Sequence, residues 1–137
     1  MADQEMNLEQ LKYMQGVYGQ EYEALAANIN SYVSLSAMMS RNIEFIENVE
    51  RVKGSNMLLN LEAGTYIEVK ASNTDKVFTY VGFGYVVEKS KDEAKAFLEE
   101  NRKKTDEIVK KLTVDREKIE TELMSIELKL NSMPREE

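Results

Sequence analysis

Residues 57–88 read MLLNLEAGTYIEVKASNTDKVFTYVGFGYVVE, and this stretch decides the fold. It is rich in β-branched and aromatic residues, and Gly, Asn and Asp interrupt it at short intervals, as is typical of short strands joined by tight turns. The pattern predicts four strands in two hairpins, at residues 57–61, 65–71, 77–81 and 85–88. On both sides of this stretch the apolar residues recur with a period of seven instead of two.

The third predicted strand is apolar on both faces, because Val77, Thr79 and Val81 alternate with Phe78 and Tyr80. A lone hairpin would leave this surface in water, where isolated hairpins are marginally stable and open strand edges invite pairing. We therefore expect the insert to be an oligomerisation platform. The residues expected to contribute are Leu59, Leu61, Ile67, Val69, Val77, Phe78, Tyr80, Val81, Tyr85 and Val87.

The residues before the insert predict one long helix over residues 8–53. Its apolar seam follows a seven-residue spacing through Leu11, Tyr18, Leu25, Tyr32, Met39 and Ile46. Asn7, with Gln10 three residues later, predicts a capped start, and Gly54 predicts a left-handed stop. A helix of this length spans roughly 70 Å, so its apolar stripe needs a partner helix.

The partner is predicted over residues 91–133, where Ser90 and Glu93 form a capping box. Its main seam runs through Leu98, Thr105, Leu112, Ile119, Ile126 and Met133. Two helices of similar length joined by a β insert are expected to run antiparallel. The expected fold class is α+β, mainly α, as a single domain over residues 1–137: a long antiparallel two-helix coiled coil with two β-hairpins between the helices, which serve as the platform for assembly.

An antiparallel arrangement brings both helix ends that lie far from the insert to one tip. The apolar residues expected there are Met1, Met6, Leu8, Leu11, Met14, Met124, Ile126, Leu130 and Met133. Flexible Met side chains adapt to varied apolar partners, so this tip is a candidate site for binding unfolded proteins. The alternative is that the same residues only complete the helical seam.

The composition argues against several other functions. A net charge of −7 repels nucleic acid and anionic membrane surfaces, and no apolar run is long enough to cross a bilayer. The chain has no His and no Cys, and it lacks a Gly-rich phosphate loop, so we expect no enzyme activity, no metal and no cofactor. Carboxylate pairs such as Glu99 with Glu100 are interpreted as a solvated helix face. We expect a soluble, cytoplasmic protein.

Several local motifs resemble the alpha class of prefoldin. They are Ala63-Gly64 entering a strand, Thr74-Asp75-Lys76-Val77 at the inter-hairpin turn, the run VGFGYVVEK at residues 81–89, and Glu93-Ala94 with Phe97-Leu98 at the start of the second helix. The beta class is similar in its helices but has one hairpin, so four predicted strands favour alpha. The sequence departs from the class at Asn60, where members often carry Pro.

The resemblance implies a hexamer of two alpha and four beta subunits, with a double β-barrel platform and six coiled-coil arms. It further implies that the arm tips hold unfolded client proteins and pass them to a group II chaperonin without ATP. Two alternatives remain open: a filament-forming paralogue, such as the gamma type, and a generic coiled-coil scaffold. A filament former would grow alone, whereas a scaffold would assemble without its β insert.

Overall fold

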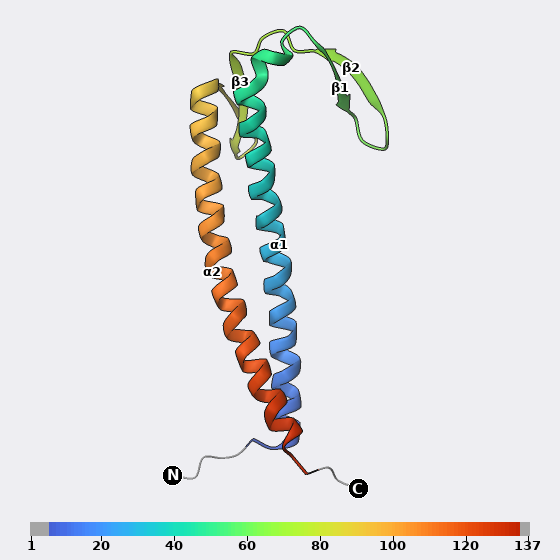
Figure 1. The fold of residues 1–137 in the computed structure, drawn as a ribbon, viewed down its shortest axis with the longest axis vertical. Helices are drawn as coiled ribbons and strands as arrows, with labels where there is room; N and C mark the ends of the chain where they lie inside the picture. The colour runs from blue at the N-terminus through green and yellow to red at the C-terminus, as the bar shows by residue number, and fades with distance from the viewer. Residues whose placement is uncertain (1–5, 135–137) are drawn as a thin grey trace. The chain divides into compact units, whose positions relative to one another are not determined.

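The computed structural model describes residues 6–134. Along the chain, four short strands follow one long helix and precede another (Figure 1). Helix α1 spans Leu8–Val52, and helix α2 spans Lys91–Asn131. The strands are β1 (Asn56–Asn60), β2 (Tyr66–Lys70), β3 (Lys76–Gly82) and β4 (Tyr85–Ser90). β1 pairs with β2 and β3 with β4, both antiparallel, in two separate sheets. The mainly α fold with two hairpins between two helices is confirmed.

The chain divides into two compact units, and each helix contributes to both. The terminal unit comprises the described residues up to Ser34 and from Thr105 onward, and the insert unit comprises residues 35–104. In each unit a segment of α1 lies beside an antiparallel segment of α2 (Figure 1). The buried side chains are Leu11, Ile29, Thr105 and Ile126 in the terminal unit, and Met39, Ile43, Thr74 and Ala94 in the insert unit.

The heptad seam predicted from the sequence matches the burial of both helices. Every position of the main row, from Leu11 to Ile46 in α1 and from Leu98 to Met133 in the second half of the chain, is buried or half-buried. In the insert unit, polar contacts add to this packing: Arg102 Nη1 donates to Ser40 Oγ over 3.2 Å, and Lys95 pairs with Glu47 at 2.8 Å. Apolar spacing therefore specifies which face of each helix is covered.

Both predicted helix caps are present. At the start of α1, Gln10 N donates to Asn7 Oδ1 (2.9 Å) and Asn7 N donates to Gln10 Oε1 (3.1 Å). At the start of α2, Glu93 N donates to Ser90 Oγ (3.2 Å) and Ser90 N donates to Glu93 Oε2 (3.4 Å). These reciprocal bonds satisfy amides that have no partner within the helix, which is why each helix begins where it does.

The hairpins differ in detail from the sequence-based expectation. β1 starts one residue earlier than predicted, and Leu61 lies outside it, where its N–H closes the turn on the carbonyl of Thr65 (2.8 Å). β3 carries a register shift between Tyr80 and Gly82, so Val81 has no partner in the β4 register. The strict alternation expected to place Val81 with Val77 and Thr79 therefore ends at a β-bulge.

None of the helices in residues 6–134 has the length and apolar content that crossing a membrane requires.

Candidate functional site

An exposed apolar surface lies at the end of the terminal unit, where α1 begins and α2 ends. Met6, Leu8 and Met124 are exposed, while Met14, Leu130 and Met133 are half-buried. We call these six residues the tip patch. Met6, Leu8 and Met124 are available to an apolar partner without any change in the helical seam, whereas the other three are partly covered by it.

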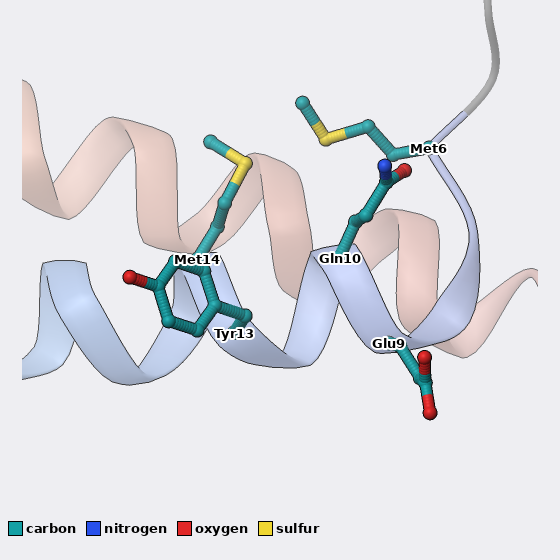
Figure 2. Close-up of a pocket in the computed structure, with 5 residues that line it drawn as sticks. All are labelled: Met6, Glu9, Gln10, Tyr13 and Met14. Atoms are coloured by element: carbon teal, nitrogen blue, oxygen red, sulfur yellow. The ribbon is translucent and has the colours of Figure 1, made fainter.

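A shallow depression of about 490 Å³ overlaps the tip patch along the first turns of α1. It is lined by Met6, Glu9, Gln10, Tyr13 and Met14. Figure 2 shows Met6 and Met14 on the same side of the helix with Gln10 between them, whereas Glu9 points another way. Two thioethers and an aromatic ring beside one amide form a surface that suits apolar side chains of varied shape.

Sequence reasoning missed Glu9, Gln10 and Tyr13, although Tyr13 is 74% exposed. A signal was present: Gln10, Tyr13 and Val17 follow the spacing i, i+3 and i+7, which places them along one face of α1. That row runs beside the heptad seam and was masked by it. Leu128, an exposed leucine of α2, was missed as well.

The remaining residues of the predicted tip divide into two groups. Leu11 and Ile126 are 1% and 4% exposed, so they pack in the seam, and their contact with a client would require the helices to part. Met1 lies outside the described residues. Client contact by these three residues stays a prediction.

The residues predicted for assembly lie mainly on exposed parts of the two hairpins. Half-buried Val69 and Val77 are the exceptions among them. The exposed members are Leu59, Leu61, Ile67, Phe78, Tyr80, Val81, Tyr85 and Val87. Leu58, Tyr66, Phe83 and Val86 are exposed too, although they are not among the residues named above for assembly. Their role in assembly stays a prediction.

The β3–β4 hairpin has two unlike faces. Phe78 lies opposite Glu88, and Tyr80 lies opposite Val86; these four exposed residues form what we call the outer face. On the other face, Val77 and Thr79 are half-buried, and Lys89 Nζ lies 4.9 Å from the centre of the Phe97 ring. A depression of about 310 Å³ in the insert unit is lined by residues that include Phe45, Val49, Val77 and also Phe78 of the outer face. The aromatic side chains of the outer face are therefore mostly exposed, and Phe78 also borders the depression beside α1.

Polar groups connect the helices to the segment between the hairpins. Glu50 Oε1 accepts hydrogen bonds from Lys91 Nζ at 2.7 Å and from Thr74 Oγ1 at 2.6 Å. The Lys91 ammonium and then the Thr74 hydroxyl hold the pKa of Glu50 below its ordinary value, and Glu50 in turn raises the pKa of Lys91. One turn away, Glu47 raises the pKa of Lys95. Sequence reasoning missed this cluster.

No group of three or more acidic side chains in residues 6–134 is arranged to hold a metal ion.

Comparison with known proteins gives one consistent family. The family model described as "Prefoldin subunit" matches residues 18–133. The prefoldin subunit alpha of Pyrococcus horikoshii is 31% identical over 81% of this chain and 76% of its own length, and that of Thermofilum pendens is 27% identical over 87% of this chain and 93% of its own.

A solved structure titled as filamentous PFD from Methanocaldococcus jannaschii has the same fold, with a TM-score of 0.58 and 21% identity. It covers 87% of this chain and 93% of the solved one. The resemblance noted from the motifs around the hairpins is thus matched by a family model over most of the chain and by several relatives named prefoldin subunit alpha. The chain belongs to the prefoldin family.

Proposed function

We propose that the chain is an alpha-class subunit of a prefoldin-type chaperone, which captures unfolded proteins without ATP and has no catalytic activity of its own. Residues 1–137 act as one prefoldin-like domain in the cytoplasm. The observation that carries the proposal is the pair of hairpins, which present apolar side chains on two-stranded sheets in a chain of the prefoldin family. Relatives named prefoldin subunit alpha support the choice of class.

Assembly is proposed to occur through the hairpins. Strands of two alpha and four beta subunits pair edge to edge and form a β-barrel platform. Pairing satisfies the edge amides and carbonyls that a two-stranded sheet leaves open, and closure of the barrel covers the outer face of β3–β4. Burial of large aromatic side chains such as Phe78 and Tyr80 supplies the association free energy.

The assembly proposal is tested by light scattering after size exclusion, on this chain alone and mixed with a beta-class prefoldin subunit. We expect a discrete hexamer in the mixture that is absent from either chain alone. A small homo-oligomer that ignores the beta subunit would reject the alpha-class assignment.

Client capture is proposed to occur at the tip patch. Its methionines are flexible and its contacts are weak, so affinity for an unfolded chain arises when several arms bind one client at once. Such a complex releases its client one contact at a time. This property suits a protein that hands clients to a group II chaperonin.

Replacing Met6, Leu8 and Met133 together with Ser is expected to reduce the suppression of client aggregation, because the substitution removes apolar contact area at the tip. Assembly with the beta subunit should be unchanged. The matched control replaces Val33, Ile108 and Val114, which are exposed apolar residues of the same unit away from the helix ends. Equal holding activity in both triple variants would reject capture at the tip.

A filament is the second candidate, since strand edges that add identical subunits without closing a ring produce an open polymer. Two observations favour keeping it: the departure at Asn60 and the fold likeness to a prefoldin whose title calls it filamentous. Long, heterogeneous species formed by this chain alone in the light-scattering experiment would support the filament and reject the hexamer.

A further inference from the structure

One carboxylate oxygen in the insert unit joins three separate segments of the chain. Glu50 lies in the last turn of α1, Thr74 lies in the segment between the two hairpins, and Lys91 is the first residue of α2. Glu50 Oε1 accepts from Thr74 Oγ1 at 2.6 Å and from Lys91 Nζ at 2.7 Å. Asp75 Oδ1 lies 3.9 Å from the same ammonium. We call Glu50, Thr74 and Lys91 the joint.

The joint sits where the β3–β4 hairpin is attached. Residues 71–75 form neither helix nor strand, so regular hydrogen bonding does not fix the path into β3. At the other end, β4 finishes at Ser90 and α2 starts at Lys91, with no residue between them. The two attachment points of the hairpin are therefore Thr74 and Lys91, and both bind the same oxygen of Glu50.

Thr74 is the strongest sign that the joint is a built feature. It is 4% exposed, and it is one of two buried polar residues among residues 6–134. A buried hydroxyl needs a hydrogen-bond partner, and a partner that carries a charge gives a stronger bond than a neutral one. The linker turn is also preformed, because Asp75 N donates to Asn73 Oδ1 over 3.1 Å.

We propose that Glu50 is a positioning residue that fixes the direction in which the β3–β4 hairpin leaves the helices, and that subunit assembly depends on this direction. The second half of the proposal rests on the proposed function, whereas the first half concerns the chain alone. Edge-to-edge pairing of strands requires the partner edges to meet in register and in alignment. A hairpin on a flexible hinge loses conformational entropy when it pairs with another subunit, which weakens assembly. A hairpin fixed by the joint has already lost this entropy on folding.

A simpler role for Glu50 is an ordinary ion pair between helices, and the chain contains a matched control for it. Glu47 and Lys95 form a pair of nearly the same length, 2.8 Å, between the same two helices. That pair does not include the linker. Glu47→Gln therefore removes an interhelical ion pair and leaves the hairpin attachment intact, while Glu50→Gln removes the ion pair within the joint.

Thr74→Val tests the two contacts of the joint separately, because it deletes the Thr74 hydroxyl and keeps the Glu50–Lys91 ion pair. Thr74→Ser restores the hydroxyl. We expect Thr74→Val to weaken assembly with the beta subunit about tenfold, the effect of losing one hydrogen bond to a charged group, and Thr74→Ser to recover it. Glu50→Gln should also impair assembly, and Glu47→Gln should not.

The direction of the hairpin is measured in the isolated chain with two spin labels. The sequence has no Cys, so Glu44→Cys on α1 and Phe83→Cys at the hairpin turn introduce the only thiols. Labelled chain diluted into unlabelled chain reports distances within one molecule. We expect a narrow distance distribution in this background and with Glu47→Gln, and a clearly broader one with Glu50→Gln or Thr74→Val. Circular dichroism verifies that helix content is unchanged.

The outcomes separate the two proposals. If the distance distribution stays narrow in both Glu50→Gln and Thr74→Val, the proposal that the joint fixes the direction of the hairpin is overturned, whether or not the variants assemble. Broadened distances with unchanged assembly would overturn the dependence of assembly on the joint. A chain that never assembles with the beta subunit rejects the proposed function, yet the label distances still decide whether Glu50 positions the hairpin. If Glu50→Gln lowers helix content, Thr74→Val and its Ser counterpart carry the test.

Discussion

Glu50 connects three segments of a chain in which residues 6–134 contain only two buried polar side chains, Thr74 and Thr105. Its partners lie 24 and 41 residues away along the sequence. Lys91, Thr74 and the nearby Lys53 all favour the ionised carboxylate and lower its pKa. Because Glu50 is largely solvent-exposed, the associated stabilisation is modest and is screened by salt.

The lowered pKa of Glu50 sets the direction of a pH effect. A carboxyl group with a depressed folded-state pKa stabilises the fold above its unfolded-state pKa, and this stabilisation is lost as the pH falls through the folded-state value. We expect thermal midpoints of the wild type and Glu50→Gln to differ at neutral pH and to converge in the acid range below the ordinary glutamate pKa. Melting curves across that range test this, and a gap that does not depend on pH would contradict it.

Residue pairs of this kind were beyond sequence reasoning. The sequence does not reveal that Glu50, Thr74 and Lys91 meet, because hydrogen bonds between segments this far apart depend on the path of the chain and not on spacing. Tyr13 was missed for a different reason, since its row on α1 runs beside a much stronger heptad row. Leu11 and Ile126, in contrast, fit both the helical seam and the tip in the sequence. Their burial in the structure assigns them to the seam.

At the scale of elements, the helices and hairpins were largely predictable. The two capping boxes begin their helices at the expected residues, and Gly54 follows α1 with a φ of 79°. The β-bulge at Val81 was not predictable from alternation, because residues 77–81 alternate regularly in the sequence and the extra residue appears only in the pairing with β4. Local rules therefore locate the elements better than they locate register.

Two glycines inside α1 offer a test of helix stability in the terminal unit. A Cβ at Gly16 or Gly19 would meet no atom within 4 Å, so Gly→Ala at each should stabilise the chain by about 1 kcal/mol through helix propensity alone. The control is Gly82→Ala, where a φ of 108° makes any side chain strained and should destabilise the hairpin. Denaturant titration measures all three variants, and a loss of stability at Gly16 or Gly19 would show a constraint that is absent from this structure.

For the whole molecule, we propose that subunits assemble through the outer face of the β3–β4 hairpin. Replacing Phe78 and Tyr80 with Ser should abolish assembly with the beta subunit, at about 2 kcal/mol or more for each central aromatic. The helices should remain folded, because both side chains are mostly exposed in the single chain and are not part of the helical seam. Tyr13→Ser, an exposed aromatic in the terminal unit, is the control. Light scattering and circular dichroism follow the two effects, and normal assembly of the double variant would exclude this face as an interface.

The two separate sheets have a consequence for the geometry of any assembly. Each described strand pairs with one neighbour only, so a subunit offers binding edges on both of its hairpins and has a valence greater than one. For such a subunit, the angle between successive edges decides whether growth ends in a ring or continues as a helix. A small rotation of one hairpin is then enough to exchange a finite particle for a fibre, with no change in the strength of any single contact.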